Sequence, residues 1–379
     1  MKRWILAALA ALVLLPLAGC WDARDVENTV YAMSVGMDYK DGKYELYVQA
    51  YDFTTVAKTL GQAPPELSAV WVGHATGKTP LSAFNFLYRT TQMRIFFGQV
   101  NSLILTENLL KKGAEDFLNA IRRYYEFRYT PWVFGTKDSL KDVYEGSQFF
   151  NLSPLMSTIY QPMEQYRQFS RIRPITFREF ISYVEEPGKT LLLPSITMLT
   201  GFWTGESQKT SKQPSLSGAF VLSGWKYKGW VRDLDVRGLR WMEPKTNRSP
   251  LIIEFRDKDS LVVYPSKPKV QIRARMKNGE PYFTVRIRAA VRVGNMSEAD
   301  TREEIERLAA QKMEEEIRKA YEKGLEMGAD LLGLEDYLYR KRNRDWKRLR
   351  REGGLELRPE SLEKVEVSVI VENAGKLKF

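Results

Sequence analysis

The sequence predicts a multi-domain protein of mixed α/β and α+β class. Three observations support this: strands alternate with helices over residues 29–195, short strands follow one another over 196–249, and 250–379 combine alternating strands with one long amphipathic helix. We therefore expect an N-terminal α/β domain, a small β-rich middle domain, and a C-terminal antiparallel sheet backed by one long helix. In an alternative division, residues 196–379 form one unit.

The first nineteen residues have the organisation of a lipoprotein signal peptide. A positive start precedes an uncharged apolar run, which closes on Leu17-Ala18-Gly19-Cys20. This tetrapeptide resembles the bacterial lipobox, in which the cysteine thiol takes the lipid. The apolar run of about fifteen residues is shorter than the roughly twenty that span a bilayer, which disfavours an ordinary membrane anchor. We predict cleavage between Gly19 and Cys20, lipidation of Cys20, and a lipidated tether at 20–28.

Charge and cysteine content restrict the function. The formal net charge is +11, which suits a protein held at a bilayer of anionic lipid. Nucleic acid is the other common partner of a basic protein, and export argues against it. Cys20 is the only cysteine, so a lipidated chain has no thiol left for a disulfide or for catalysis.

The N-terminal domain begins with a predicted β-hairpin. Thr29–Asp38 and Lys43–Tyr51 are strand-like runs on either side of Asp41-Gly42, a dipeptide typical of tight hairpin turns. Thr79 and Pro80 then predict the start of a helix whose apolar face carries Leu81, Phe84, Leu87 and Tyr88. The other expected elements are strands at 69–72, 99–105 and 130–134, a short helix from Thr106 to Gly113, and a helix at 115–125.

The pattern of short strands in the middle region predicts an antiparallel meander. Its expected strands are Leu216–Leu222, Gly229–Leu234, Leu251–Phe255 and Leu261–Tyr264.

The C-terminal region contains the clearest hairpin, at 270–277 and 283–293 around Asn278-Gly279. Strict alternation gives it one apolar face and one basic face, the latter carrying Arg273, Arg275, Lys277, Arg286, Arg288 and Arg292. A helix at about 298–327 has an apolar stripe that should pack on the apolar face. A basic helical stretch at 336–349 and a last strand at 364–372, in the same sheet, complete the domain.

No stretch of the sequence predicts catalysis. Residues 73–79 look like a phosphate-binding loop, but only three residues separate the glycines where the motif needs four. The sole histidine, His74, lacks a Gly-x-Ser-x-Gly partner motif, and no His or Cys cluster suggests a metal. Glu185-Glu186 and Glu314–Glu316 are carboxylate runs, and the second is interpreted as a mostly solvated face of the long helix. A glycosidase would need two carboxylates that converge across a cleft. We therefore expect no enzyme activity, no metal and no cofactor.

A second basic cluster lies near the C-terminus. Its members are Arg340, Lys341, Arg342, Arg344, Lys347, Arg348, Arg350 and Arg351. Two interpretations remain open for this patch and for the basic sheet face. Either they dock to lipid headgroups or to an acidic partner, or they are solvated surfaces that the acidic long helix partly neutralises.

Several short motifs together resemble the Ger(x)C family of spore germination lipoproteins. Cys20-Trp21-Asp22-Ala23-Arg24-Asp25 is similar to the family's mature start, with Asp25 where Glu is commoner. Gln99 stands near the position of a frequent histidine. Further similar segments are Val35–Asp38, Tyr47–Gln49, Gly77–Thr79, Leu103–Glu107 with Lys112-Gly113, Leu193–Ile196, Gly218–Phe220 with Gly229-Trp230, Gly328–Gly333, and Trp346. The order of these motifs covers essentially the whole chain.

This resemblance implies the C subunit of a nutrient germinant receptor. It implies an exported, non-catalytic lipoprotein on the outer face of the spore inner membrane, in a complex with two membrane subunits, A and B. The alternative is a lipoprotein solute-binding protein, which needs two similar α/β lobes around a hinge. A secreted hydrolase would need activity that depends on Glu185, Glu186 or His74.

Overall fold

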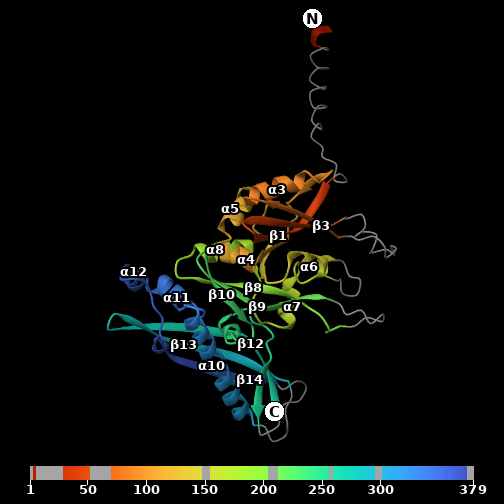
Figure 1. Ribbon diagram of the computed structural model, residues 1–379. Helices are drawn as coiled ribbons and strands as arrows, with labels where there is room; N and C mark the ends of the chain where they lie inside the picture. The colour runs from red at the N-terminus through yellow and green to blue at the C-terminus, as the bar shows by residue number, and fades with distance from the viewer. Residues whose placement is uncertain are drawn as a thin grey trace.

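The computed structural model describes residues 3–5, 29–51, 70–146, 154–203, 212–255, 259–294 and 301–373. These residues form two β-sheets with helices packed on them (Figure 1). The larger sheet contains β1 (Thr29–Lys40), β2 (Lys43–Tyr51), β3 (Val70–Gly77), β4 (Arg94–Phe96), β5 (Ser102–Thr106), β6 (Trp132–Thr136), β7 (Ile175–Thr176), β8 (Thr190–Leu199), β9 (Gln213–Ser223) and β10 (Lys226–Arg232). The smaller contains β11 (Leu251–Phe255), β12 (Asp259–Lys277), β13 (Glu280–Val293) and β14 (Leu362–Asn373). The predicted mixed α/β class is confirmed.

The strand order of the larger sheet is β10-β9-β8-β6-β5-β1-β2-β3, with β4 on β1 and β7 on β6. The expected first hairpin is confirmed: β1 and β2 are antiparallel, and Asp41 and Gly42 form the turn with φ of 50° and 76°. Positive φ at both positions is the turn geometry that matches the twist of paired strands. β3 pairs with β2 as far as Gly77, so the third strand is longer than the sequence predicted.

Helices cover both faces of the larger sheet. α3 (Pro80–Tyr88), α4 (Glu107–Lys112), α5 (Glu115–Arg123) and α8 (Phe177–Glu185) share one core cluster, while α6 (Leu140–Glu145) belongs to another. Along β5, Leu103 and Leu105 belong to the first cluster and Ile104 to the second, since alternate residues of a strand point to opposite faces. A 3₁₀ turn (Pro154–Met156) and α7 (Pro162–Gln168) follow α6.

Two predicted helix starts are confirmed. Thr79 and Ser82 form a reciprocal capping box before α3, and the Thr106 side chain accepts the backbone N–H of Leu109 in α4. Gly113 ends α4 with a φ of 109°.

The apolar face of α3 differs in part from the expected one. Leu81 and Tyr88 are exposed, and the buried residues are Pro80, Ala83, Phe84 and Leu87. Their spacing of three, four and seven defines the stripe that faces the sheet, and positions 81 and 88 lie beside it.

The strands expected to form one meander divide between the two sheets. β9 and β10 continue the larger sheet from β8, whereas β11 pairs with β12 in the smaller one. The single meander was therefore wrong, because a strand pattern shows which face is apolar but does not identify the neighbouring strand. The chain passes between the sheets through α9 (Leu239–Met242). The domain limits near 195 and 249 stay a prediction.

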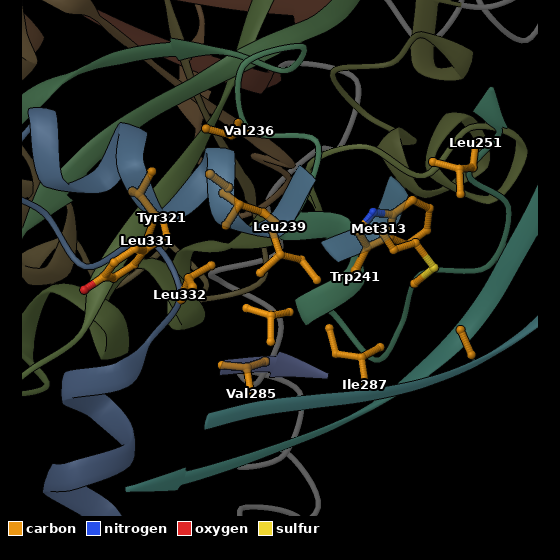
Figure 2. Packing of buried hydrophobic residues seen from close by; sticks show 14 of the residues in the cluster. Val236, Leu239, Trp241, Leu251, Val285, Ile287, Met313, Tyr321, Leu331 and Leu332 are labelled. Carbon is orange, nitrogen blue, oxygen red and sulfur yellow. The ribbon is translucent and has the colours of Figure 1, made fainter. Parts of the chain in front are cut away.

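The second sheet contains the expected long hairpin. β12 and β13 are antiparallel around Asn278 and Gly279, with Ile272 opposite Val285. Their apolar face packs on α10 (Arg302–Glu326), which is capped by Thr301. Figure 2 shows Trp241 and Met313 above Val285 and Ile287 of this sheet. Of the helix expected at 298–327, positions 298–300 lie outside the described residues.

β14 joins this sheet as predicted, but it runs parallel to β13. The C-terminal sheet is therefore antiparallel only across β11, β12 and β13. The cause is the connection: α10 carries the chain back along the sheet, so the next strand starts where β13 started. A 3₁₀ turn (Pro359–Ser361) leads into β14.

Two helices replace the basic stretch expected at 336–349. α11 (Leu334–Lys341) and α12 (Asn343–Arg351) are separated at Arg342, whose φ of −136° and ψ of 49° are not helical. Trp346 and Leu349 turn inward and join the core of the second sheet.

Candidate functional site

Two predicted site residues lie outside the described part of the chain. Gly19 and Cys20, the expected cleavage and lipidation positions, precede Thr29, where the described fold begins. Lipidation of Cys20 therefore stays a prediction. Among the described residues, no helix is both long and apolar enough to cross a bilayer.

The glycine-rich stretch before α3 is a strand followed by a helix cap. Gly73 to Gly77 lie in β3, paired with β2, and Thr79 caps α3. A phosphate-binding loop directs successive N–H groups at one anion, whereas an extended strand directs them alternately to opposite sides. The geometry therefore supports a structural role for this stretch.

His74 makes a contact between neighbouring strands. Its ring lies 4.4 Å from the ring of Tyr47, and its Nε2 lies 3.8 Å from the carboxylate of Glu45. In the ranges that the structure describes, no group of three or more His, Cys, Asp or Glu side chains is placed to hold a metal ion.

The first carboxylate run forms ion pairs. Glu185 lies 2.8 Å from Arg122, and Glu186 lies 2.5 Å from Arg340 of α11. The second pair joins the end of α8 to the C-terminal helices. These contacts account for both carboxylates as structural groups.

The second run differs from the prediction at one position. Glu316 is buried and not solvated: Arg240 Nη2 lies 3.1 Å from both of its oxygens, and the Trp241 indole donates to it at 2.7 Å. Burial lowers the pKa of Arg240, and the attraction of Glu316 opposes that change. The sequence held a signal for this position, because Glu316 follows Met313 by three residues and precedes Ala320 by four.

Asp330 is a second buried carboxylate that sequence reasoning did not single out. It accepts backbone N–H groups from Leu332 at 3.2 Å and Glu335 at 2.7 Å, and thus holds the turn into α11. Burial raises its pKa to about 7, and these hydrogen bonds oppose the rise. The Gly328–Gly333 motif therefore forms a structural turn centred on Asp330.

The basic face of β12 and β13 is exposed, as predicted. β14 partly neutralises it, since Arg275 pairs with Glu363 and Arg286 with Glu366. The long helix, expected to supply the acids, packs on the other face. Arg273, Arg288 and Arg292 have no carboxylate partner among the described residues.

The 340–351 cluster contains three arginines with structural contacts. Arg340 pairs with Asp336 as well as Glu186. Arg342 donates to the Ala274 carbonyl and Arg348 to the Gly279 carbonyl, both at 2.9 Å. The last two bonds fix α12 against the hairpin of the second sheet.

The other five residues of the cluster are presented to solvent. In the part of the chain that the structure describes, none has a carboxylate partner; they are Lys341, Arg344, Lys347, Arg350 and Arg351. The Arg350 guanidinium lies 5.0 Å from the centre of the Trp346 ring. This arrangement forms a fixed basic surface on α12 and the end of α11 that can attract an anionic partner.

A shallow hollow of 470 Å³ lies beside β8 and β9. Phe169, Phe202 and Trp203 contribute to its wall; among the described residues Arg171 is the only charged one that lines it, and Arg171 already pairs with Asp233 at 2.5 Å. Ligand sites normally combine an apolar wall with several converging polar groups. The hollow therefore gives little support to solute binding.

These features define a class: a two-sheet mixed α/β protein in which, among the described residues, two groups of basic side chains without carboxylate partners lie on the second sheet and on α11 and α12. A family model described as the spore germination protein N-terminal domain matches residues 22–198. A second, described as spore germination B3/GerAC-like, C-terminal, matches 217–375. The chain belongs to this Ger(x)C family of spore germination proteins.

Individual relatives agree with this assignment. Spore germination protein KC of Bacillus subtilis is 22% identical over 397 aligned residues, which cover 99% of this chain and 96% of the relative. The putative spore germination protein YfkR of the same organism is 21% identical over an alignment that covers 80% of this chain and 78% of YfkR. The crystal structure of the GerBC protein has the same fold, with a TM-score of 0.53, 15% identity, and coverage of 92% of this chain and 99% of GerBC. Family membership supports a role in spore germination.

Proposed function

We propose that this protein is a lipid-anchored, non-catalytic subunit of a nutrient germinant receptor. It acts on the outer face of the spore inner membrane, through contacts with the membrane subunits A and B. The observation that carries the proposal is the ordered match of both family models, at 22–198 and 217–375, behind a sequence that resembles a lipobox.

The basic surface of α12 and the end of α11 suits the contact with a partner. Arg342 and Arg348 hold α12 on the hairpin, so its unpaired residues keep a fixed geometry. Complementary charge steers encounter and selects the partner. We assign Lys341, Arg344, Lys347, Arg350 and Arg351 to an acidic segment of a receptor subunit, while Arg340 has a structural role.

The residues considered for catalysis have structural partners, which favours a binding role. His74 packs against the ring of Tyr47, and Glu185 pairs with Arg122. A solute-binding protein would instead bind a small molecule tightly in a calorimetric titration.

The test is to replace the gene in a spore former with tagged variants. Cys20→Ala should lose lipid labelling and slow nutrient germination, measured as loss of optical density, whereas Asp25→Glu should retain both. The wild-type chain should co-purify with two membrane proteins from spore membranes. Normal germination of deletion spores with every nutrient would contradict the proposal.

A further inference from the structure

One end of the larger sheet gathers the beginnings of its parallel strands. β1 begins at Thr29, which lies opposite Arg94 of β4, and β5 and β6 run in the same direction. β3 also begins at this end, because Val70 lies opposite Tyr51, and Tyr51 opposite Tyr31.

α3 leads towards the same end. It starts after Gly77, its Leu87 packs over Gly73 of β3, and the Tyr88 hydroxyl lies 3.0 Å from the hydroxyl of Tyr124. The α5–β6 connection is there too, since the Tyr125 hydroxyl accepts a hydrogen bond from Arg94 at 3.2 Å. Figure 1 shows α3 and β3 at the opposite end of the molecule from β14 and α10.

Large apolar side chains are exposed at this end. Tyr125 is 85% exposed, Phe86 47% and Met93 45%. They come from three separate segments: the end of α3, the connection to β4, and the connection after α5. We call these residues, with Arg89, Arg123 and Arg128, the Thr29 surface. Exposed apolar groups gathered from several segments indicate an interaction site.

The charge of the Thr29 surface is positive. Its nearby acid, Glu126, is almost buried and already holds Arg94 and the Phe97 N–H. Arg89, Arg123 and Arg128 have no carboxylate partner within the described ranges. The Arg89 guanidinium lies 5.8 Å from the Phe86 ring, so cation and aromatic ring occupy one place. Aromatic rings beside arginines suit the headgroup level of an anionic bilayer.

The length of the tether gives the second argument. Nine residue steps separate Cys20 from Thr29. At roughly 3.3–3.6 Å for each step, an extended chain reaches about 30 Å at most. A lipid on Cys20 therefore keeps Thr29 near the bilayer, whichever path the chain takes.

We infer that the Thr29 surface lies directly on the anionic lipid bilayer. Phe86, Met93 and Tyr125 reach the headgroup level, while Arg89, Arg123 and Arg128 contact lipid phosphates. The inference rests on the lipidation that the proposed function includes. It also directs the second sheet and α12 away from the lipid, because Figure 1 shows them well separated from α3.

A single-cysteine experiment tests the orientation. Once lipid occupies the thiol of Cys20, a cysteine introduced by Tyr125→Cys is the sole reactive thiol; Ser368→Cys, on the exposed face of β14, is the matched control. Each lipidated full chain is labelled with an environment-sensitive fluorophore in phosphatidylcholine–phosphatidylglycerol vesicles. We expect a blue shift and quenching by nitroxide-labelled lipid at position 125 and neither at 368. A water-like signal at 125, or quenching that requires the membrane subunits, would overturn the inference.

A charge-reversal experiment does not depend on lipidation. The chain from Trp21 onward, without lipid, is sedimented with phosphatidylglycerol vesicles. Reversing Arg89, Arg123 and Arg128 to Glu should weaken binding by at least about tenfold, because each basic residue contributes near such a surface. Reversing Arg273, Arg288 and Arg292 changes net charge equally and should have a much smaller effect. Equal losses of vesicle binding in the two triple variants would overturn the inference. If the wild-type chain carried no lipid label but this difference in binding remained, only the proposed lipid anchor would be contradicted.

Discussion

Arg240 of α9 and Glu316 of α10 form a buried ion pair that connects the passage between the two sheets to the long helix. Arg240 Nη2 lies 3.1 Å from both carboxylate oxygens, and Nη1 donates to Ser249 at 2.9 Å and to the Pro250 carbonyl at 3.1 Å. One guanidinium therefore joins three segments: α9, the approach to β11, and α10.

Removing one partner of this pair should be costly. Glu316→Leu leaves Arg240 buried without its counter-charge, so we expect the free energy of unfolding to fall by about 3–5 kcal/mol in denaturant titrations. The neighbouring Glu315→Leu changes an exposed residue and should cost less than about 0.5 kcal/mol. The double variant Arg240→Met, Glu316→Leu should recover much of the loss. Equal stability of the two single variants would refute the assignment.

Gly238 allows α9 to approach α10 closely. A Cβ at this position would lie 2.5 Å from Ile317 Cα and would also meet the Glu316 carbonyl. Because backbone atoms cannot move aside as a side chain can, Gly238→Ala should lower the free energy of unfolding by about 1–3 kcal/mol. At Gly146 a Cβ would meet chiefly the flexible end of Met198, so Gly146→Ala should cost less than about 1 kcal/mol. Similar losses in both variants would contradict this explanation.

The sequence specified local structure better than it specified neighbours. Asp41-Gly42, Thr79 and Thr106 marked turns and caps correctly, because their signals depend on adjacent residues. The split of β10 and β11 between two sheets, and the parallel direction of β14, depend on contacts between distant segments.

The candidate site also divides into features that depend on adjacent residues and features that depend on distant ones. The exposed basic faces could be predicted from the spacing of basic residues along the strands and helices alone. The burial of Glu316 required its partner Arg240, which lies 76 residues away in the sequence. The gathering of Met93 and Tyr125 near Thr29 required the sheet order.

Asp330 should make stability depend on pH. Its pKa rises from 3.8 to about 7 in the fold, chiefly through burial. Below the lower value both states hold the proton. Between the two values the unfolded chain releases it first, so Asp330 should make the free energy of unfolding fall as pH rises, by up to about 1.4 kcal/mol per pH unit. Asp330→Asn should lack this contribution in denaturant titrations across that range.

A second variant distinguishes this cause from general loss of packing. The charge of Glu335 also raises the pKa of Asp330. Glu335→Gln keeps an oxygen for the Trp346 indole, which now donates to Glu335 at 3.0 Å. It should move the pH-dependent window to lower pH without removing it. An unchanged window in both variants would contradict the role of Asp330.

The two kinds of basic residue on α12 and at the end of α11 should give opposite phenotypes. Reversing Lys341, Arg344 and Lys347 to Glu should leave the unfolding midpoint nearly unchanged, because none makes an ion pair within the described residues. The same variant should reduce co-purification with the membrane subunits. The difference between the variant and the wild-type chain should become smaller at high salt, because salt screens the wild-type contact. Arg348→Ala should instead lower the free energy of unfolding by about 1–3 kcal/mol, since it removes the donor to the Gly279 carbonyl and leaves α12 loose on the hairpin. A triple variant that unfolds early but still assembles normally would reverse these assignments.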